Sequence, residues 1–149
     1  MVKICDFISV DRISILNIKD KNKVLKDLCH ILATADTIKD SAELEKAILE
    51  RETLISTSIG LGIAIPHVRL KSVTGMTIVI GVVKEGMDFK SFDDQPVNII
   101  IMIAAPEGSH REYLSLLAKI ALLLKNKSIR NSIIEAEDSL EIYDILKRY

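Results

Sequence analysis

The chain has 149 residues, of which 48% are hydrophobic and 28% are charged, and its formal net charge is −1. This length and composition predict one globular domain over residues 1–149 with a substantial core. Its basic side chains form no block, so no nucleic-acid partner is expected, and the absence of a long apolar run or signal-peptide pattern predicts a cytoplasmic protein without membrane insertion.

The first third of the chain predicts an extended segment followed by two helices. Residues 8–18 are mostly apolar and predict a short extended entry segment. Asp20 is a candidate cap for a helix over residues 21–35, whose lysines, including Lys21, are expected to face water. Asp40 then begins a capping-box pattern for a second short helix that ends at Arg51. Arg51 is either a cation that favours a helix C-terminus or a functional residue.

Two nearly continuous apolar runs in the middle of the chain predict strands. They cover residues 75–83 and 97–105, and their β-branched composition indicates burial on both faces. Turn-forming residues surround a short segment at 89–92 between them, so the two strands are expected to be antiparallel neighbours.

Three helices are expected after the second strand. Ser109 is a candidate cap for a helix over residues 110–125, whose broad apolar stripe predicts the longest and best-buried helix. A short helix over residues 129–136 follows, and Asp138 begins a last amphipathic helix. Helices before and after central strands predict an α/β fold, with a mixed central β-sheet flanked by helices on both faces.

The candidate site is a segment rich in glycine and small hydroxyl residues that ends at a histidine. Gly60 and Gly62 permit positive φ or a close backbone approach. Pro66 ends a short apolar run, which places His67 at a strand end or a sharp turn. The glycine amides, three neighbouring hydroxyls and the guanidinium of Arg51 are suited to hold a tetrahedral anion. The hydroxyls are those of Ser56, Thr57 and Ser58.

An imidazole beside such an anion site is a candidate nucleophile toward phosphorus, because its neutral form is abundant near pH 7. The alternative for His67 is an ordinary turn residue. The segment is not a Walker loop, since no lysine follows Gly62. No Gly-x-Ser-x-Gly elbow and no zinc-ligand spacing occur, so a hydrolase triad, a metal site and a cofactor are not expected. Cys5 and Cys29 are interpreted as reduced, inert thiols.

Four motifs resemble the type-2 enzyme IIA domains of the bacterial phosphoenolpyruvate-dependent phosphotransferase system, the fructose, mannitol and nitrogen-regulatory group. They are Arg51-Glu52, Ser56-Thr57, Ile59-Gly60-x-Gly62-Ile63-Ala64-Ile65-Pro66-His67 and Asp94-Gln95-Pro96-Val97. The resemblance extends over nearly the whole chain. It implies that His67 is the phosphorylated residue, through Nε2, and that Arg51 is the active-site arginine.

The resemblance also implies a phosphotransferase component that works through a phosphohistidine. A histidine-containing phosphocarrier protein would deliver the phosphoryl group, and an enzyme IIB partner would receive it during sugar uptake. The alternative is a free-standing, nitrogen-regulatory type of domain that switches protein partners with its phosphorylation state. A third reading is a degenerate domain that keeps the fold and has lost transfer. The sugar and homodimer formation stay open.

The chain departs from the family pattern at three positions. Tyr113-Leu114 stands where family members often carry a second histidine followed by leucine. His110 lies one helical turn earlier, close enough to share a face with Tyr113. Two alternatives stay open for it: a second site histidine that reaches His67, or a polar residue at a helix start. Ser58 replaces a usual glycine, and Leu61 replaces a common polar residue.

Overall fold

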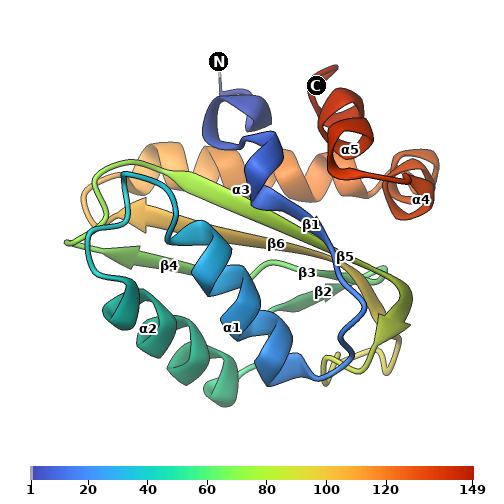
Figure 1. Ribbon diagram of the computed structural model, residues 1–149, viewed down its shortest axis with the longest axis horizontal. Helices are drawn as coiled ribbons and strands as arrows, with labels where there is room; N and C mark the ends of the chain where they lie inside the picture. The colour runs from blue at the N-terminus through green and yellow to red at the C-terminus, as the bar shows by residue number, and fades with distance from the viewer. Residues whose placement is uncertain (1) are drawn as a thin grey trace.

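The computed structural model describes residues 2–149, which form a six-stranded mixed sheet with helices on both faces (Figure 1). The predicted α/β fold is therefore confirmed. The helices are α1 (Lys21–Leu32), α2 (Ser41–Leu54), α3 (His110–Leu124), α4 (Lys127–Glu135) and α5 (Ser139–Leu146), with short 3₁₀ turns η1 (Ile4–Phe7) and η2 (Val10–Arg12). The strands are β1 (Ile13–Ile15), β2 (Ser58–Gly60), β3 (Ile63–Ala64), β4 (His67–Leu70), β5 (Thr77–Met87) and β6 (Val97–Pro106).

The two long strands, β5 and β6, are antiparallel neighbours at the centre of the sheet, as predicted. The strand order is β1-β5-β6-β3-β2, and β4 also pairs with β6. β1 is parallel to β5, and both β3 and β4 are parallel to β6. The short strands β2 and β4 are not among the predicted elements. β4 follows β3 along the same edge of β6, which places its first residue at the side of the sheet.

Alternating side chains of the central strands supply two separate cores. On β5, Ile78 and Ile80 face the layer that contains α3, α4 and α5, whereas Val79 and Val83 face α1 and α2. Figure 1 shows α1 and α2 together on one face of the sheet and α3 on the other. The sheet is buried on both faces because its strands are apolar at successive positions.

Three helix caps follow the predicted pattern, since Asp20, Asp40 and Asp138 each accept a hydrogen bond from a backbone N–H three residues later. Ser109 occupies the N-cap position of α3, but its hydroxyl donates to the carbonyl of Pro106 instead of capping the helix. The expected extended segment over residues 8–18 is only partly extended, because η2 interrupts it and β1 covers three residues.

The helix α3 is the longest, with 15 residues, but the expectation that it is the best buried is wrong. It buries four side chains, whereas the 12-residue α1 buries five. The reason is that α1 packs against both β5 and α2. Leu114 of α3 is 48% exposed. Every helix within residues 2–149 is too short or too polar to span a bilayer.

Candidate functional site

His67 is the first residue of the edge strand β4, as expected for a residue at a strand end. Its Cα pairs with that of Ile103 on β6, and the carbonyl of Pro66 accepts the Ile103 amide. Ile65 lies between β3 and β4, and its amide donates to the carbonyl of Thr57. The imidazole ring is therefore carried by backbone that is tied to both neighbouring segments, and the side chain is half-buried.

The backbone carbonyl of Ile65 determines the tautomer of His67. Nδ1 lies 2.5 Å from this oxygen, which only accepts hydrogen bonds, so Nδ1 carries the proton. In the neutral ring, Nε2 then holds the unshared electron pair. A guanidinium has donors only, and Nη2 of Arg51 lies 3.2 Å from Nε2 in agreement with that assignment. The geometry leaves Nε2 as the nucleophilic nitrogen.

Arg51 reaches His67 from the last turn of α2. Leu44 and Ile48 of α2 pack into the core, and Arg51 follows one turn later, where α2 packs against β4. Burial lowers the pKa of His67 below its ordinary 6.5, and the positive charge of Arg51 lowers it further. The hydrogen bond to Ile65 and the charge of Glu52 oppose this shift. The neutral imidazole is therefore the predominant form at neutral pH.

Two of the three predicted phosphate-binding hydroxyls are committed to other partners. Ser56 donates to the carbonyl of Phe89 at 3.0 Å, and Thr57 donates to Oε1 of Glu52 at 2.7 Å. Oγ of Ser58 accepts from the Gly60 amide at 3.4 Å, which leaves its hydrogen available. All three line the same hollow as His67. Among these three hydroxyls, that of Ser58 has a hydrogen that is not donated to another group within residues 2–149.

Gly60 and Gly62 adopt the positive φ that the sequence predicts. Together with Leu61 they form a turn in which all three residues have positive φ, between 60° and 87°. A Cβ on Gly60 would lie 3.3 Å from Phe92, and one on Gly62 would lie 3.1 Å from Asn98. Neither glycine is among the described residues that line the hollow at His67. The glycines are needed for the β2–β3 turn and its contact with the 92–98 loop.

Glu52 organises the loop that leads to His67. It is 7% exposed, and its carboxylate accepts both the amide and the hydroxyl of Thr57. Nζ of Lys21 lies 3.0 Å from the same carboxylate, donates to the carbonyl of Phe89, and stands 4.4 Å from the centre of the Phe89 ring. The expectation that Lys21 faces water is therefore wrong. Lys21 is drawn inward because it neutralises a buried carboxylate.

The ring of Tyr113 contacts His67 from the α3 side. The two ring centres are 5.8 Å apart, and the planes are inclined by 49°. His110 does not bond to His67 in the described contacts; instead its Nδ1 lies 2.9 Å from Nη1 of Arg69. The carbon at the centre of the Arg69 guanidinium lies 5.3 Å from the Tyr113 ring. The structure thus brings Arg51, His67 and Tyr113 together. His110 contacts Arg69 instead of His67.

Apolar side chains surround the opening at His67. Ile55, Ile59, Leu117 and Ala121 line the hollow beside the imidazole. Ile55 is 72% exposed and Ile59 is 44% exposed, so this rim faces solvent. A half-buried imidazole with an apolar rim is accessible to another protein.

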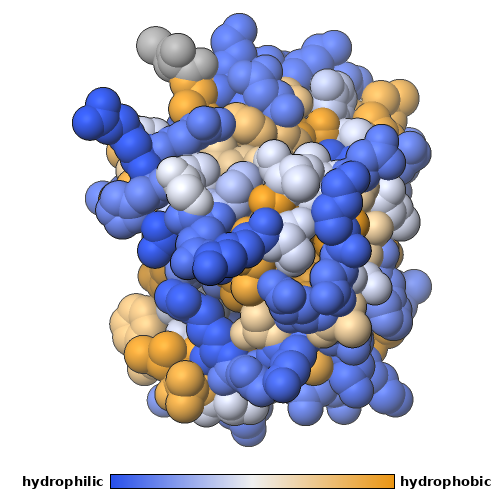
Figure 2. Space-filling model, turned by 90° about the vertical axis from the view of Figure 1, so that its left-hand side faces the viewer, coloured by the Kyte–Doolittle hydropathy of each residue, from blue (hydrophilic) through white to orange (hydrophobic). Residues whose placement is uncertain are grey.

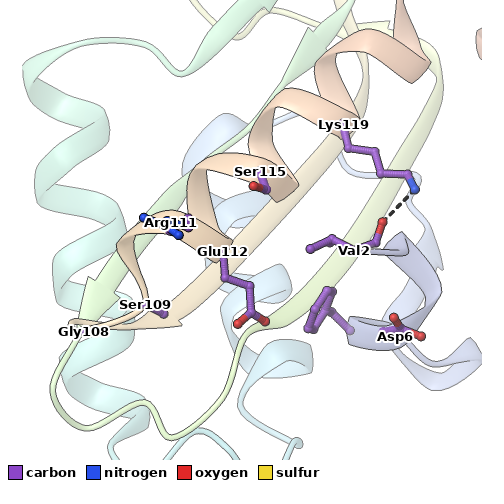
Figure 3. A pocket seen from close by; sticks show the side chains of 9 residues that line it. Val2, Asp6, Gly108, Ser109, Arg111, Glu112, Ser115 and Lys119 are labelled. Carbon is purple, nitrogen blue, oxygen red and sulfur yellow. Dashed lines mark hydrogen bonds between the residues drawn. The ribbon is translucent and has the colours of Figure 1, made fainter.

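A second hollow lies between η1 and the first turns of α3 (Figure 3). Acidic and basic side chains both line it, including Asp6, Arg111 and Glu112, and Lys119 donates to the carbonyl of Val2 at 2.7 Å. Its described lining includes none of the predicted site residues. Residues 2–149 also contain no group of three or more potential metal-ligating side chains.

The sequence of residues 6–149 matches the model of one protein family: phosphoenolpyruvate-dependent sugar phosphotransferase system, EIIA 2. The chain belongs to this family. It is a phosphotransferase-system EIIA component, a phosphocarrier, in the fructose, mannitol and nitrogen-regulatory group.

Two relatives and one solved structure illustrate the range of the EIIA family. The chain is 38% identical over 131 residues to the fructose-specific EIIABC component of Bacillus subtilis, covering 88% of this chain and 21% of that protein. It is 32% identical to a nitrogen regulatory protein of Bradyrhizobium diazoefficiens, covering 88% and 85%. The crystal structure of the nitrogen regulatory protein IIA-Ntr from Neisseria meningitidis superposes with a TM-score of 0.87 at 28% identity, covering 96% and 98%.

The sequence patterns did not predict two residues that the structure places at this EIIA site, Arg69 and Lys21. A predicted strand beginning at His67 would have indicated Arg69, since residues two apart on a strand share a face, but β4 is not among the predicted elements. Lys21 carried no such indication, because its partner Glu52 is 31 positions away in the sequence and the contact depends on the packing of α1 beside α2.

Replacing Arg51 with alanine should raise the pKa of His67 toward 6.5, because a positive charge beside Nε2 is removed. NMR titration of the imidazole nitrogens measures this, and Arg51→Lys, which keeps the charge, should retain the low pKa. An unchanged or lower pKa in Arg51→Ala contradicts this electrostatic role.

The low pKa of His67 also makes the stability of the wild type depend on pH. Just below pH 6.5, the unfolded state binds more protons than the folded state. The contribution of His67 to stability is therefore complete above pH 6.5 and decreases as the pH falls toward the folded-state pKa.

Replacing Glu52 with glutamine should lower the free energy of unfolding by about 1–3 kcal/mol, because Lys21 loses a charged partner in a buried setting. Chemical denaturation measures the loss, and the Thr57 amide should exchange faster with solvent. Glu50→Gln is the matched control, since the Glu50 side chain is 68% exposed and pairs with the exposed Lys46 at 4.0 Å. Its effect should stay within about 0.5 kcal/mol. Equal losses in the two variants would show that the buried pair has no special role.

Proposed function

We propose that this domain accepts a phosphoryl group on Nε2 of His67 from a histidine-containing phosphocarrier protein and passes it to an enzyme IIB partner during sugar uptake. The observation that carries the proposal is the state of the His67 ring. Its Nδ1–H is bonded to the Ile65 carbonyl, and Nε2 faces a guanidinium at 3.2 Å. An electron pair beside a cation suits a nucleophile that receives a negatively charged phosphoryl group.

The transfer step forms one bond to phosphorus and breaks another. The electron pair on Nε2 of His67 attacks the phosphorus of the phosphocarrier's phosphohistidine, and the phosphorus–nitrogen bond on the carrier breaks. The carrier imidazole leaves with that electron pair. The reverse chemistry, with a nucleophile of enzyme IIB as the acceptor, regenerates neutral His67. No metal takes part in this scheme.

Positive charge develops on the His67 ring during this step, and the phosphoryl group bound to it is negatively charged. The ring becomes positive as Nε2 bonds to phosphorus, and the Ile65 carbonyl stabilises that charge through Nδ1–H. Arg51 then donates to the phosphoryl oxygens, and the free hydroxyl hydrogen of Ser58 is a second donor from the same hollow. Both donors line the hollow at His67 before the phosphoryl group arrives, and Arg51 exchanges its bond to Nε2 for bonds to the phosphoryl oxygens.

The exposed apolar side chains around the site suit a protein partner. Leu54 at the end of α2 is 85% exposed, and Leu61 in the β2–β3 turn is 55% exposed. Ile55 and Ile59 line the hollow at His67 itself, where their exposed apolar area excludes water when a partner docks. In-line transfer between two histidines needs such a dry contact, because water competes as a phosphoryl acceptor.

Replacing His67 with alanine should abolish phosphorylation without unfolding the domain, because the ring is half-buried and lies at a strand end. The protein is incubated with labelled phosphoenolpyruvate, enzyme I and the phosphocarrier protein, and the label is located by peptide mapping. His30→Ala is the matched control, since the His30 side chain is 73% exposed on α1 and should not alter labelling. An unlabelled wild type, or label on another residue, would overturn the proposal.

A second candidate function is regulation of protein partners by phosphorylation. It is supported by the match over 85% of the length of the nitrogen regulatory relative and by the TM-score of 0.87 to a nitrogen regulatory protein. A phosphoryl group on His67 adds negative charge at the centre of the apolar rim, which changes the preference for a docking surface. The same phosphohistidine then acts as a switch instead of a relay intermediate.

Partner capture separates the two functions. Under the regulatory function, the phosphorylated protein and His67→Ala should retain different sets of partners from a cell extract, because only one of them carries the added charge. The relay function instead requires that purified enzyme IIB removes the label from His67. Identical partner sets for the two states would rule out the switch, and label that no enzyme IIB accepts would rule out the relay.

A further inference from the structure

We infer that Arg69 supplies a second guanidinium to the phosphoryl group on His67, an inference that rests on the function proposed above. In the unphosphorylated structure, this guanidinium is held at the edge of the site by His110 and the ring of Tyr113. Phosphorylation gives it a stronger partner.

The side chains of Arg69 and His67 both lie beside the ring of Tyr113. Both residues lie on β4, two positions apart, so their side chains leave the same face of the strand. The His67 ring centre lies 5.8 Å from the Tyr113 ring, and the Arg69 guanidinium carbon lies 5.3 Å from it. Burial raises the pKa of Tyr113, and the positive charges of Arg51 and Arg69 oppose that shift. Tyr113 therefore lies within the electrostatic reach of both guanidiniums.

The charge of the phosphorylated state calls for a second cation. A phosphoryl group carries nearly two negative charges near neutral pH, and Arg51 alone offers one positive charge. Arg51 must also give up its bond to Nε2 once phosphorus occupies that nitrogen. Arg51 and Arg69 line a common hollow with Lys71, Glu43 and Glu107, and Arg51 also lines the hollow at His67, so the two guanidiniums lie in neighbouring positions.

The present partner of Arg69 is easily exchanged. Nη1 donates to Nδ1 of His110 at 2.9 Å, and both side chains are exposed. Because arginine only donates, this bond needs an uncharged imidazole acceptor. A hydrogen bond to a charged phosphoryl oxygen is roughly twice as strong as one to a neutral acceptor. The bond lies where β4 ends and α3 begins, at the left of Figure 1, and Figure 2 shows that side of the molecule as largely hydrophilic.

The test compares Arg69→Gln with the wild type in the phosphoryl exchange with the phosphocarrier protein. Loss of the second guanidinium should shift the exchange equilibrium away from His67 by about tenfold. Lys71→Gln is the matched control, because Lys71 is exposed, lines the same hollow and carries the same charge. It should leave the equilibrium close to that of the wild type. An equal shift in both variants would reduce the effect to net charge and overturn the inference.

A phosphorus NMR titration of phosphorylated His67 supplies a readout that a purely structural role would not move. A nearby guanidinium favours the doubly charged phosphoryl group, so the titration midpoint should rise in Arg69→Gln by about half a pH unit and stay near the wild-type value in Arg69→Lys. Unchanged midpoint and equilibrium in Arg69→Gln would overturn the role of Arg69 while wild-type labelling still supports the relay. A wild type that takes no label would instead overturn the proposed function itself.

Discussion

The hydrogen bond from Nδ1–H of His67 to the carbonyl of Ile65 is the interaction on which the site depends. It assigns the proton to one nitrogen and the electron pair to the other, and so decides which atom faces Arg51. The carbonyl is available because Ile65 falls in the gap between β3 and β4, next to Pro66. A continuous strand would have directed that carbonyl into the sheet ladder.

The position of β4 at the side of the sheet lets groups from both helical layers reach one imidazole. Arg51 comes from α2 on one face, and Tyr113 comes from α3 on the other. In the middle of the sheet, neighbouring strands would separate these two layers. An edge histidine is also open to a partner, whereas its ring remains dry enough for burial to lower its pKa. Access and a neutral nucleophile therefore follow from one placement.

The buried pair of Lys21 and Glu52 shows how the scaffold holds this edge in shape. Burying two charges is costly, and the cost is offset here by the bonds to Thr57 and Phe89. These contacts tie the start of α1, the end of α2 and the 89–92 loop to the segment that carries Ser58 and His67. The hydroxyls of Ser56 and Thr57 also bond to Phe89 and Glu52 of this network, so both residues help to hold the shape of the site.

The sequence by itself determined the α/β class, the central antiparallel pair of strands and the location of the candidate histidine. Those features depend on local patterns: β-branched runs, capping residues, and a proline after a short apolar run. Only the tertiary structure decided which donors face His67. The partners of Thr57, Lys21 and His110 come from distant segments, and a hydroxyl in a motif looks the same whether it is free or already bonded. Hydrogen-bond commitment is a property of the packed chain, which is why the sequence indicated His67, Arg51 and the neighbouring hydroxyls but not which of those hydroxyls is free to donate.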